Sequence, residues 1–209
     1  AQETWGDFVY IGSGDRENPT DITVTNRFYA IRNTWPQTWN DDTPLTDSDL
    51  VDVTGDILQD SSKTETEKAT HLSAIQTGNG WRMDLEHSGE KIVSTPLVYN
   101  KVVYFTTFTP TSSTTSADTD LCFSTGEGTA RLYAVDYKTG NAVFADFDGN
   151  SATLTKGDKY KELGGGIPSE PSVVVTEKGT FVITGTDTGM DRHDPKDKRS
   201  MTRYYWLKQ

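Results

Sequence analysis

The sequence predicts an all-β fold that forms part of a β-propeller, and three observations support this prediction. First, one pattern occurs three times: a β-branched and aromatic run, a polar loop, and an arginine that leads an alternating aromatic run. Second, the 209 residues include 18 Gly and only 33% hydrophobic residues, which is typical of short strands joined by polar loops. Third, Ser-Thr-Pro at 94–96 and Ser-Glu-Pro at 169–171 precede two matching hairpins. Because a repeated unit determines the whole architecture, we predict about three blades of antiparallel strands.

The repeats assign the runs to strands A to D of successive blades. The first blade is expected to hold strands B, C and D, at 8–11, 27–31 and 81–85. The second is expected to be complete, with strands at 92–99, 101–108, 130–136 and near 141–146. The third is expected to hold A, B and C, at 172–175, 180–184 and 203–207. Since the first and last blades are incomplete, we interpret 1–209 as the C-terminal portion of a propeller domain. The remainder of its own propeller, or a complementing chain, is expected to complete it.

Long polar loops separate these strands. The matching positions Val9, Val103 and Val182 lie farther apart than the roughly 40 to 50 residues of a bare blade. The excess falls in three polar segments, at 33–80, 109–129 and 147–165. We predict a polar insertion at 33–80 that contains one short surface helix at 61–74, where Ser and Thr caps precede Glu and Lys.

The charge balance excludes one class of partner. The chain has 31 Asp and Glu against 20 Lys and Arg, a net charge of -11. Such a chain repels phosphate backbones, so we expect no nucleic-acid partner. No stretch approaches the ~20 apolar residues that span a bilayer, so we expect no membrane insertion.

Several blocks of the chain resemble the C-terminal propeller of PilY-type proteins, which are type IV pilus biogenesis factors and tip adhesins. The most specific blocks are Gly-Ser-Gly-Asp-Arg-Glu at 12–17 and Gly-Ile-Pro-Ser-Glu-Pro at 166–171. Leu-Tyr-Ala-Val-Asp at 132–136 matches as well, but quinoprotein propellers share it. The resemblance implies an extracellular or cell-surface protein, exported through the periplasm. It also implies pilin or minor pilins, and a host or surface ligand, as partners.

One segment has the spacing of half a calcium site. Asp146, Asp148 and Asn150 place oxygen side chains at alternate positions, which can converge on one Ca²⁺ ion. The following residues lack the remaining ligands, so an Asx/Gly turn is the alternative interpretation. The calcium-binding loop that the resemblance implies belongs to an earlier blade and has no copy here. No other cofactor is predicted.

Two tryptophans are candidates for a partner contact. Trp35 and Trp39 bracket Pro36 in the polar insertion, where aromatic side chains can be exposed to a partner. Packing of the insertion onto the blade is the alternative. Trp81 and Trp206, in contrast, lie in predicted strands and are expected to pack between blades.

The remaining polar residues give no catalytic set. Cys122 has no nearby histidine, and the 3 His lack the close partners that zinc or heme requires. We expect surface histidines, with His193 in a charged loop at 191–196. The arginines that lead strand C, at 27, 131 and 203, are expected to pair with a carboxylate or carbonyl of the neighbouring blade.

The sequence therefore predicts a protein that is not an enzyme. We expect an interaction module of an exported, type IV pilus-associated protein that acts in pilus assembly or tip adhesion. Two alternatives remain open: a fragment of a quinoprotein-like dehydrogenase propeller, and a subunit of an extracellular filament whose missing strands come from a neighbouring chain.

Overall fold

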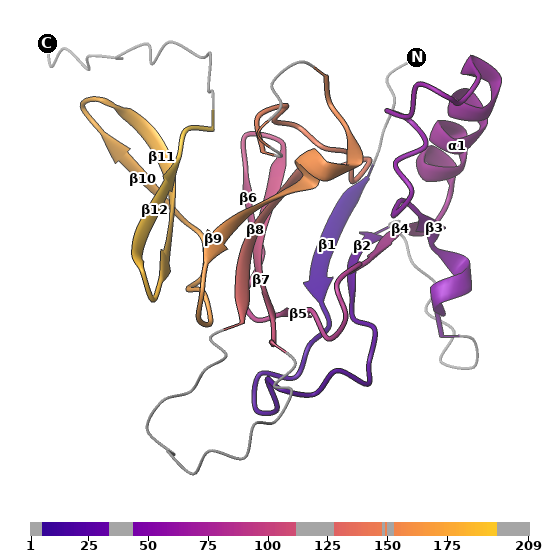
Figure 1. Cartoon of the computed structure of the whole chain (residues 1–209). Coiled ribbons are helices and arrows are strands. Elements are labelled where there is room, and N and C mark those ends of the chain that lie inside the picture. Colours follow the sequence, from indigo (N-terminus) through magenta and orange to yellow (C-terminus); the bar gives the residue numbers. More distant parts are fainter. Residues whose placement is uncertain (1–5, 34–43, 112–127, 148, 150–152, 196–209) are drawn as a thin grey trace, which may run out of the picture.

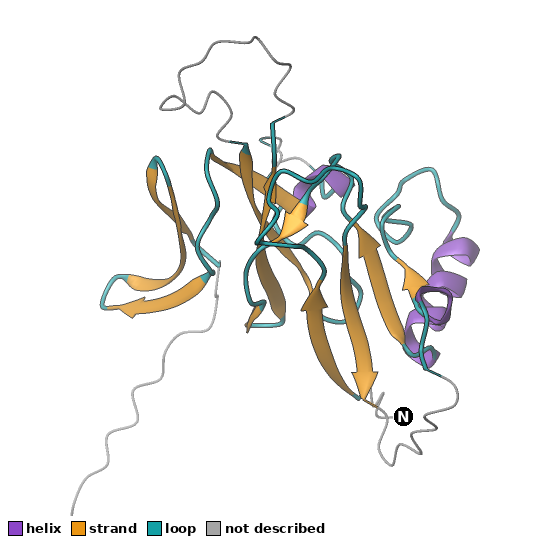
Figure 2. Cartoon of the chain, turned by 90° about the horizontal axis from the view of Figure 1, so that it is seen from below, coloured by secondary structure: helices purple, strands orange, loops and turns teal. Residues whose placement is uncertain are grey.

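The fold is all-β and resembles part of a propeller, as the sequence predicts. The computed structural model describes residues 6–33, 44–111, 128–147, 149 and 153–195. Three sheets stand side by side in chain order, and one α-helix lies beyond the first sheet (Figures 1 and 2). Almost all neighbouring strands are antiparallel, since the described part of the chain holds one parallel pair.

The three sheets follow the order of the repeats. The first contains β1 (Asp7–Gly12), β2 (Arg27–Asn33), β4 (Gly80–Asp84) and β3 (Val51–Asp52), in that spatial order. The second contains β5 (Lys91–Ile92) and β6 (Leu97–Tyr99), which both pair with β7 (Val102–Thr109), then β8 (Thr129–Asp136) and β9 (Tyr160–Gly164). The third contains β10 (Ser172–Thr176), β11 (Gly179–Thr186) and β12 (Gly189–His193). Two 3-10 turns complete the structure: η1 (Asp47–Asp49) and η2 (Lys156–Lys159).

The middle sheet is buried on both faces. On β7, Val103 and Phe105 face the first sheet, while Val102 and Tyr104 face the third. The ring of Phe105 stacks on Phe28 of the first sheet, with centroids 4.0 Å apart and planes 5° apart. Two-sided burial explains why β7 and β8 are continuous apolar runs rather than alternating ones.

Trp81 packs between two sheets, as predicted. It is fully buried on β4, and its ring lies against Phe28 with centroids 5.9 Å apart. The backbone of Gly140 approaches it from the second sheet: a Cβ atom there would come within 3.2 Å of the indole ring. Trp206 lies outside the described residues.

The predicted helix is confirmed within the segment that joins β2 to β4. Helix α1 (Glu65–Thr77) begins after Thr64, whose hydroxyl accepts the Glu67 N–H while the Glu67 carboxylate accepts the Thr64 N–H. This reciprocal capping satisfies two donors that the first turn leaves unpaired. At the other end, the Arg32 guanidinium donates to the carbonyls of Ile75 and Gln76. A cation near a helix C-terminus is favourable, so Arg32 fixes the helix to the first sheet.

The prediction for the last strand of the second sheet is wrong. It places that strand near 141–146, but β9 pairs with β8, and only an isolated bridge joins Ala142 to Val135. Phe144 of the predicted strand and Phe147, which follows it, have another role. Phe144 and Phe147 lie in and beside a turn and bury their rings against the third sheet. Their hydrophobicity reflects side-chain burial rather than strand pairing.

The interpretation of 191–196 as a loop is wrong for 191–193, which belong to β12; residues 194 and 195 follow the strand, and 196 lies outside the described residues. β12 pairs with β11 through a two-residue turn at Asp187 and Thr188, and it holds the place that the prediction gives to 203–207. That segment lies outside the described residues. A charged sequence can form this strand because Lys161 on β9 pairs with Asp191 at 2.6 Å.

The strand-leading arginines do not pair with the neighbouring blade. The Arg27 guanidinium contacts Asp84 at 2.7 Å and Asp47 at 3.0 Å, and both carboxylates belong to the first sheet or its insertion. Arg131 contacts Glu162 of the adjacent strand β9 at 2.9 Å. The cross-strand neighbour is closer than the next sheet, so each arginine ties strand C to strand D. Arg203 lies outside the described residues.

The repeat gives a matched pair of substitutions. Val103 is fully buried, whereas Val9, at the equivalent position of the first sheet, is 59% exposed. Val103→Ala is expected to lower the free energy of unfolding by about 2 kcal/mol, because it removes buried methyl groups and leaves a cavity. Val9→Ala is expected to change it by less than about 0.5 kcal/mol. Urea unfolding followed by tryptophan fluorescence measures both; equal effects would contradict the packing described.

Candidate functional site

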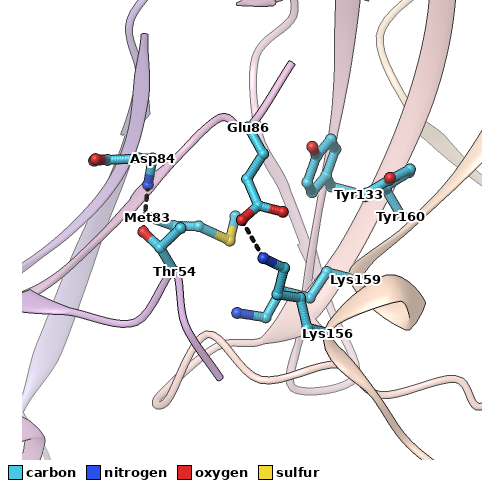
Figure 3. A pocket seen from close by; sticks show the side chains of 8 residues that line it. All are labelled: Thr54, Met83, Asp84, Glu86, Tyr133, Lys156, Lys159 and Tyr160. Carbon is cyan, nitrogen blue, oxygen red and sulfur yellow. Dashed lines mark hydrogen bonds and ion pairs between the residues drawn. The ribbon is translucent and has the colours of Figure 1, made fainter. Parts of the chain in front are cut away.

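A small cleft with several charged side chains around it lies where the first and second sheets meet (Figure 3). Its volume is about 10 Å³, which is room for about one water molecule. Figure 3 shows Glu86 and Lys156 pointing toward one another, and they form an ion pair. The lining residues are Thr54, Met83, Asp84, Glu86, Tyr133, Lys156, Lys159 and Tyr160. A cleft of this size cannot hold a substrate beside its charged groups.

Lys159 is the most perturbed cation of this cleft. Its side chain is 3% exposed, and its Nζ donates to the Val53 carbonyl at 2.7 Å. Burial lowers the pKa of Lys159 to about 8, although the carboxylate of Asp56 opposes this shift. A lysine with a lowered pKa can act as a base or nucleophile. Here the ammonium instead ties the segment after β3 to the second sheet.

A second buried network lies at the same junction. Glu90 is 1% exposed and accepts hydrogen bonds from the Thr107 hydroxyl at 2.6 Å and the Tyr133 hydroxyl at 3.1 Å. The Arg131 guanidinium lies 3.9 Å from the same carboxylate. Burial and the charge of Glu90 raise the pKa of Tyr133 well above its usual value. The network therefore holds a neutral tyrosine against a paired carboxylate, which fixes the loop before β5.

The structure places only part of the predicted calcium site. Asp146 is exposed in a turn in which the Gly149 N–H donates to the Asp146 carbonyl at 3.3 Å. Asp148 and Asn150 lie outside the described residues. Among the residues that the structure describes, no group of three His, Cys, Asp or Glu side chains could hold a metal ion. The calcium site stays a prediction.

The predicted partner contacts also lie beyond the described part of the chain. Trp35 and Trp39 both fall in 34–43, and Cys122 falls in 112–127. Their roles stay predictions. In the described ranges, no helix is long and apolar enough to cross a membrane.

The two Ser-x-Pro motifs occupy equivalent places, as the repeat predicts. The Ser94 hydroxyl accepts the main-chain N–H of Thr106 on β7 at 2.9 Å, and the Ser169 hydroxyl accepts that of Gly185 on β11 at 2.8 Å. The middle residues of the two motifs meet, since the Thr95 hydroxyl donates to Glu170 at 2.9 Å. An open groove of about 420 Å³ runs from these motifs to the edge of β1.

The end sheets carry apolar side chains on their outward faces. On the first sheet, Val9 and Ile11 are 59% and 53% exposed. On the third, Met190 is 73% exposed and borders a groove of about 490 Å³ with Phe181 and Ile183. Exposed apolar patches of this kind are typical of surfaces that pack against another protein surface. The alternation of apolar and polar residues in the sequence does not reveal these exposed patches. Only the positions of the sheets show which faces have no neighbouring sheet among the described residues.

The surface position expected for His193 is wrong. His193 is 7% exposed, and the edges of Phe144 and Phe147 contact its ring, with centroids 4.4 and 4.9 Å away. The charged residues around His193 in the sequence give no sign of its burial, because its aromatic partners come from a turn 46 to 49 residues earlier. Burial, with the charge of Lys161, lowers the pKa of His193 to about 4.

The pKa of His193 predicts a pH dependence of stability. Between its usual pKa of 6.5 and about 4, the unfolded chain binds a proton that the folded chain does not. The free energy of unfolding therefore falls as the pH falls through this window. In His193→Gln this contribution is absent, so the wild type should lose up to about 1.4 kcal/mol more per pH unit than the variant. Parallel pH curves from urea unfolding would contradict this prediction.

Asp56 predicts the opposite effect. Its side chain is 4% exposed, and one carboxylate oxygen has no hydrogen-bond partner among the described residues. Burial raises the pKa of Asp56 to about 6, against the opposing charge of Lys159. The stability contributed by the neutral acid is full below pH 3.8 and is lost as the pH rises through about 6.

The variant Asp56→Asn tests this sign. Asn keeps the shape of the side chain and tolerates the left-handed backbone at φ 55°. The free energy of unfolding of the variant, relative to that of the wild type, should increase between about pH 4 and pH 6, by about 3 kcal/mol in total, and stay constant above. Thermal unfolding in a pH series measures the difference, and a variant that is less stable at pH 7 than at pH 4, relative to wild type, would contradict it.

The comparisons with known proteins concern the fold. No family model and no curated protein matches the chain. A solved structure does match: the crystal structure of the Pseudomonas aeruginosa PilY1 C-terminal domain, at 15% identity and a TM-score of 0.53. The match covers 88% of this chain and 41% of that chain. The fold of this chain is therefore similar to part of that domain, and the chain spans about two fifths of the domain's length.

Proposed function

We propose that the chain is a non-enzymatic interaction module of an exported, type IV pilus-associated protein. It acts at the cell surface in pilus assembly or tip adhesion, and its partners are pilin or minor pilins. The observation that carries the proposal is the similarity in fold to the PilY1 C-terminal domain over 88% of this chain. The blocks at 12–17 and 166–171, which resemble PilY-type proteins, support it independently.

The chemistry of the described surface favours contact over catalysis. The cleft that contains Lys159 has a volume of about 10 Å³, and its charged groups are paired: Lys159 with a main-chain carbonyl, Glu86 with Lys156, and Asp84 with arginines of the first sheet. The larger grooves are open, and one of them lies on an outward apolar face of the third sheet. Such faces suit the packing of another protein surface better than the positioning of a small substrate.

The test is a binding measurement with the pilins of the organism that encodes this chain. The purified chain is immobilised, and the major pilin and each minor pilin are passed over it. We expect saturable binding to at least one of them. Met190→Lys, which places a charge on the outward face of the third sheet, is expected to weaken binding at least about tenfold. Leu154→Lys is the control, because Leu154 is also exposed, at 37%, but lies away from that face.

Two results would contradict the proposal. One is the absence of binding to every pilin, combined with protection of the native protein from protease added to intact cells. The other is turnover: oxidation of alcohols by the chain in the presence of a quinone and an electron-accepting dye would favour the quinoprotein alternative.

A further inference from the structure

Among the described residues, no strand of the first sheet corresponds to one that the other two sheets have. In the second sheet β5 and β6 lie on one side of the long strand β7, and in the third β10 lies on the same side of β11. The equivalent long strand of the first sheet is β1, which forms the edge of its sheet. No described strand pairs with its outer side.

The main chain of β1 presents a defined set of groups at this edge. The Ser13 N–H donates to the Arg27 carbonyl at 2.8 Å, while the Arg32 N–H points away from β1 and donates to the Asn79 carbonyl at 2.8 Å. Because hydrogen-bonded and non-bonded pairs alternate in an antiparallel ladder, the N–H and C=O groups of three residues point outward. These residues are Phe8, Tyr10 and Gly12. Among the described residues, none of their N–H groups has a partner.

The repeat shows what those groups bind in the other sheets. Gly12 lies three residues after Val9, as Thr106 lies three after Val103 and Gly185 three after Val182. In the second and third sheets, this residue donates its N–H to the hydroxyl of the serine in a Ser-x-Pro motif. In the first sheet Gly12 provides the equivalent N–H, and no Ser-x-Pro motif within the described ranges lies beside it.

The groove beside β1 has the position that a third such motif requires. It is lined by Tyr10 and Gly12 of β1 and by the Ser94, Thr95 and Pro96 motif of the second sheet. The existing motifs already touch one another, since Thr95 donates to Glu170. A strand along β1 would place its own Ser-x-Pro beside Thr95 in the same way.

We propose that the edge of β1 binds an extended segment supplied from outside this chain, in which Ser-x-Pro precedes a run of apolar residues. The segment adds an antiparallel strand to the first sheet, and its serine hydroxyl accepts the Gly12 N–H. Strand addition of this kind takes its affinity from main-chain hydrogen bonds. The inference depends on the register of the three sheets and is independent of the proposed role in pili.

The probe is a synthetic peptide with the sequence of residues 167–176, Ile-Pro-Ser-Glu-Pro-Ser-Val-Val-Val-Thr. It is added at about 1 mM to the full chain, and amide hydrogen exchange is followed by NMR. We expect exchange at Phe8, Tyr10 and Gly12 to slow at least tenfold. Exchange at Val9 and Ile11, whose N–H groups point to β2, is expected to stay unchanged.

Two pairs of peptides make the test specific. In the native hairpin, Val174 is opposite Phe181 and its N–H faces β11, whereas the N–H of Val175 faces away. N-methylation of the peptide at Val174 should therefore abolish the protection of β1, and N-methylation at Val175 should leave it. Replacing the Ser169 equivalent by Ala should reduce the protection of Gly12 most.

Every other outcome overturns the proposal. Equal effects of the two N-methylated peptides would exclude main-chain pairing, and protection confined to β3, β9 or β12 would assign the peptide to another edge. Protection of Phe8, Tyr10 and Gly12 in the chain alone would mean that its own residues cover the edge. Protection that rises with protein concentration would mean that a second copy does so. No change at about 1 mM peptide would exclude the site.

Discussion

The described structure depends on the two-sided burial of its middle sheet. Side chains of β7 alternate between two cores, so that Phe105 stacks on Phe28 of the first sheet while Tyr104 packs toward Phe144 and the third. A sheet that is apolar on both faces exposes a large patch to water if either neighbour is removed. The outer sheets therefore cover the middle one, and each of the two cores is shared between the middle sheet and one neighbour.

Buried polar groups fix how the first two sheets meet. Dispersion between aromatic rings tolerates small slips, whereas a buried charge must keep its partners or pay a large desolvation penalty. Glu90 keeps Thr107 and Tyr133, and Lys159 keeps the Val53 carbonyl. These contacts specify one arrangement of the sheets. They also explain why Lys159, whose pKa is lowered by burial, lies in a cleft too small for a substrate.

The sequence predicts the overall architecture better than it predicts which segments form the last strands of the second and third sheets. The long strands, the helix and the equivalence of the Ser-x-Pro motifs follow from periodicity and repetition, because each is encoded within a few neighbouring residues. The strands β9 and β12 do not follow from periodicity or repetition. β9 comes after a polar segment and β12 has a charged sequence, so each forms a strand only through its tertiary contacts. The burial of His193 has the same cause: its pKa depends on Phe144 and Phe147, which adjoin it only in the fold.

Strand β1 has the same kind of sequence as β7, but only one of its faces is covered by a neighbouring sheet. β1 has apolar residues on both faces, as β7 does, yet Phe8 and Tyr10 are partly buried against the core between the first two sheets while Val9 and Ile11 are exposed. An apolar residue at an exposed strand position stabilises nothing in the isolated chain, and it raises the risk of aggregation. Two such residues in one strand therefore make sense as a packing face rather than as solvent-exposed surface.

The outward main-chain groups of the same strand point in a perpendicular direction, along the sheet, so β1 presents a face for packing and an edge for pairing. A strand with an exposed apolar face and an edge that no described strand pairs with is suited to contact with another polypeptide segment, which is the physical argument for the proposed strand addition.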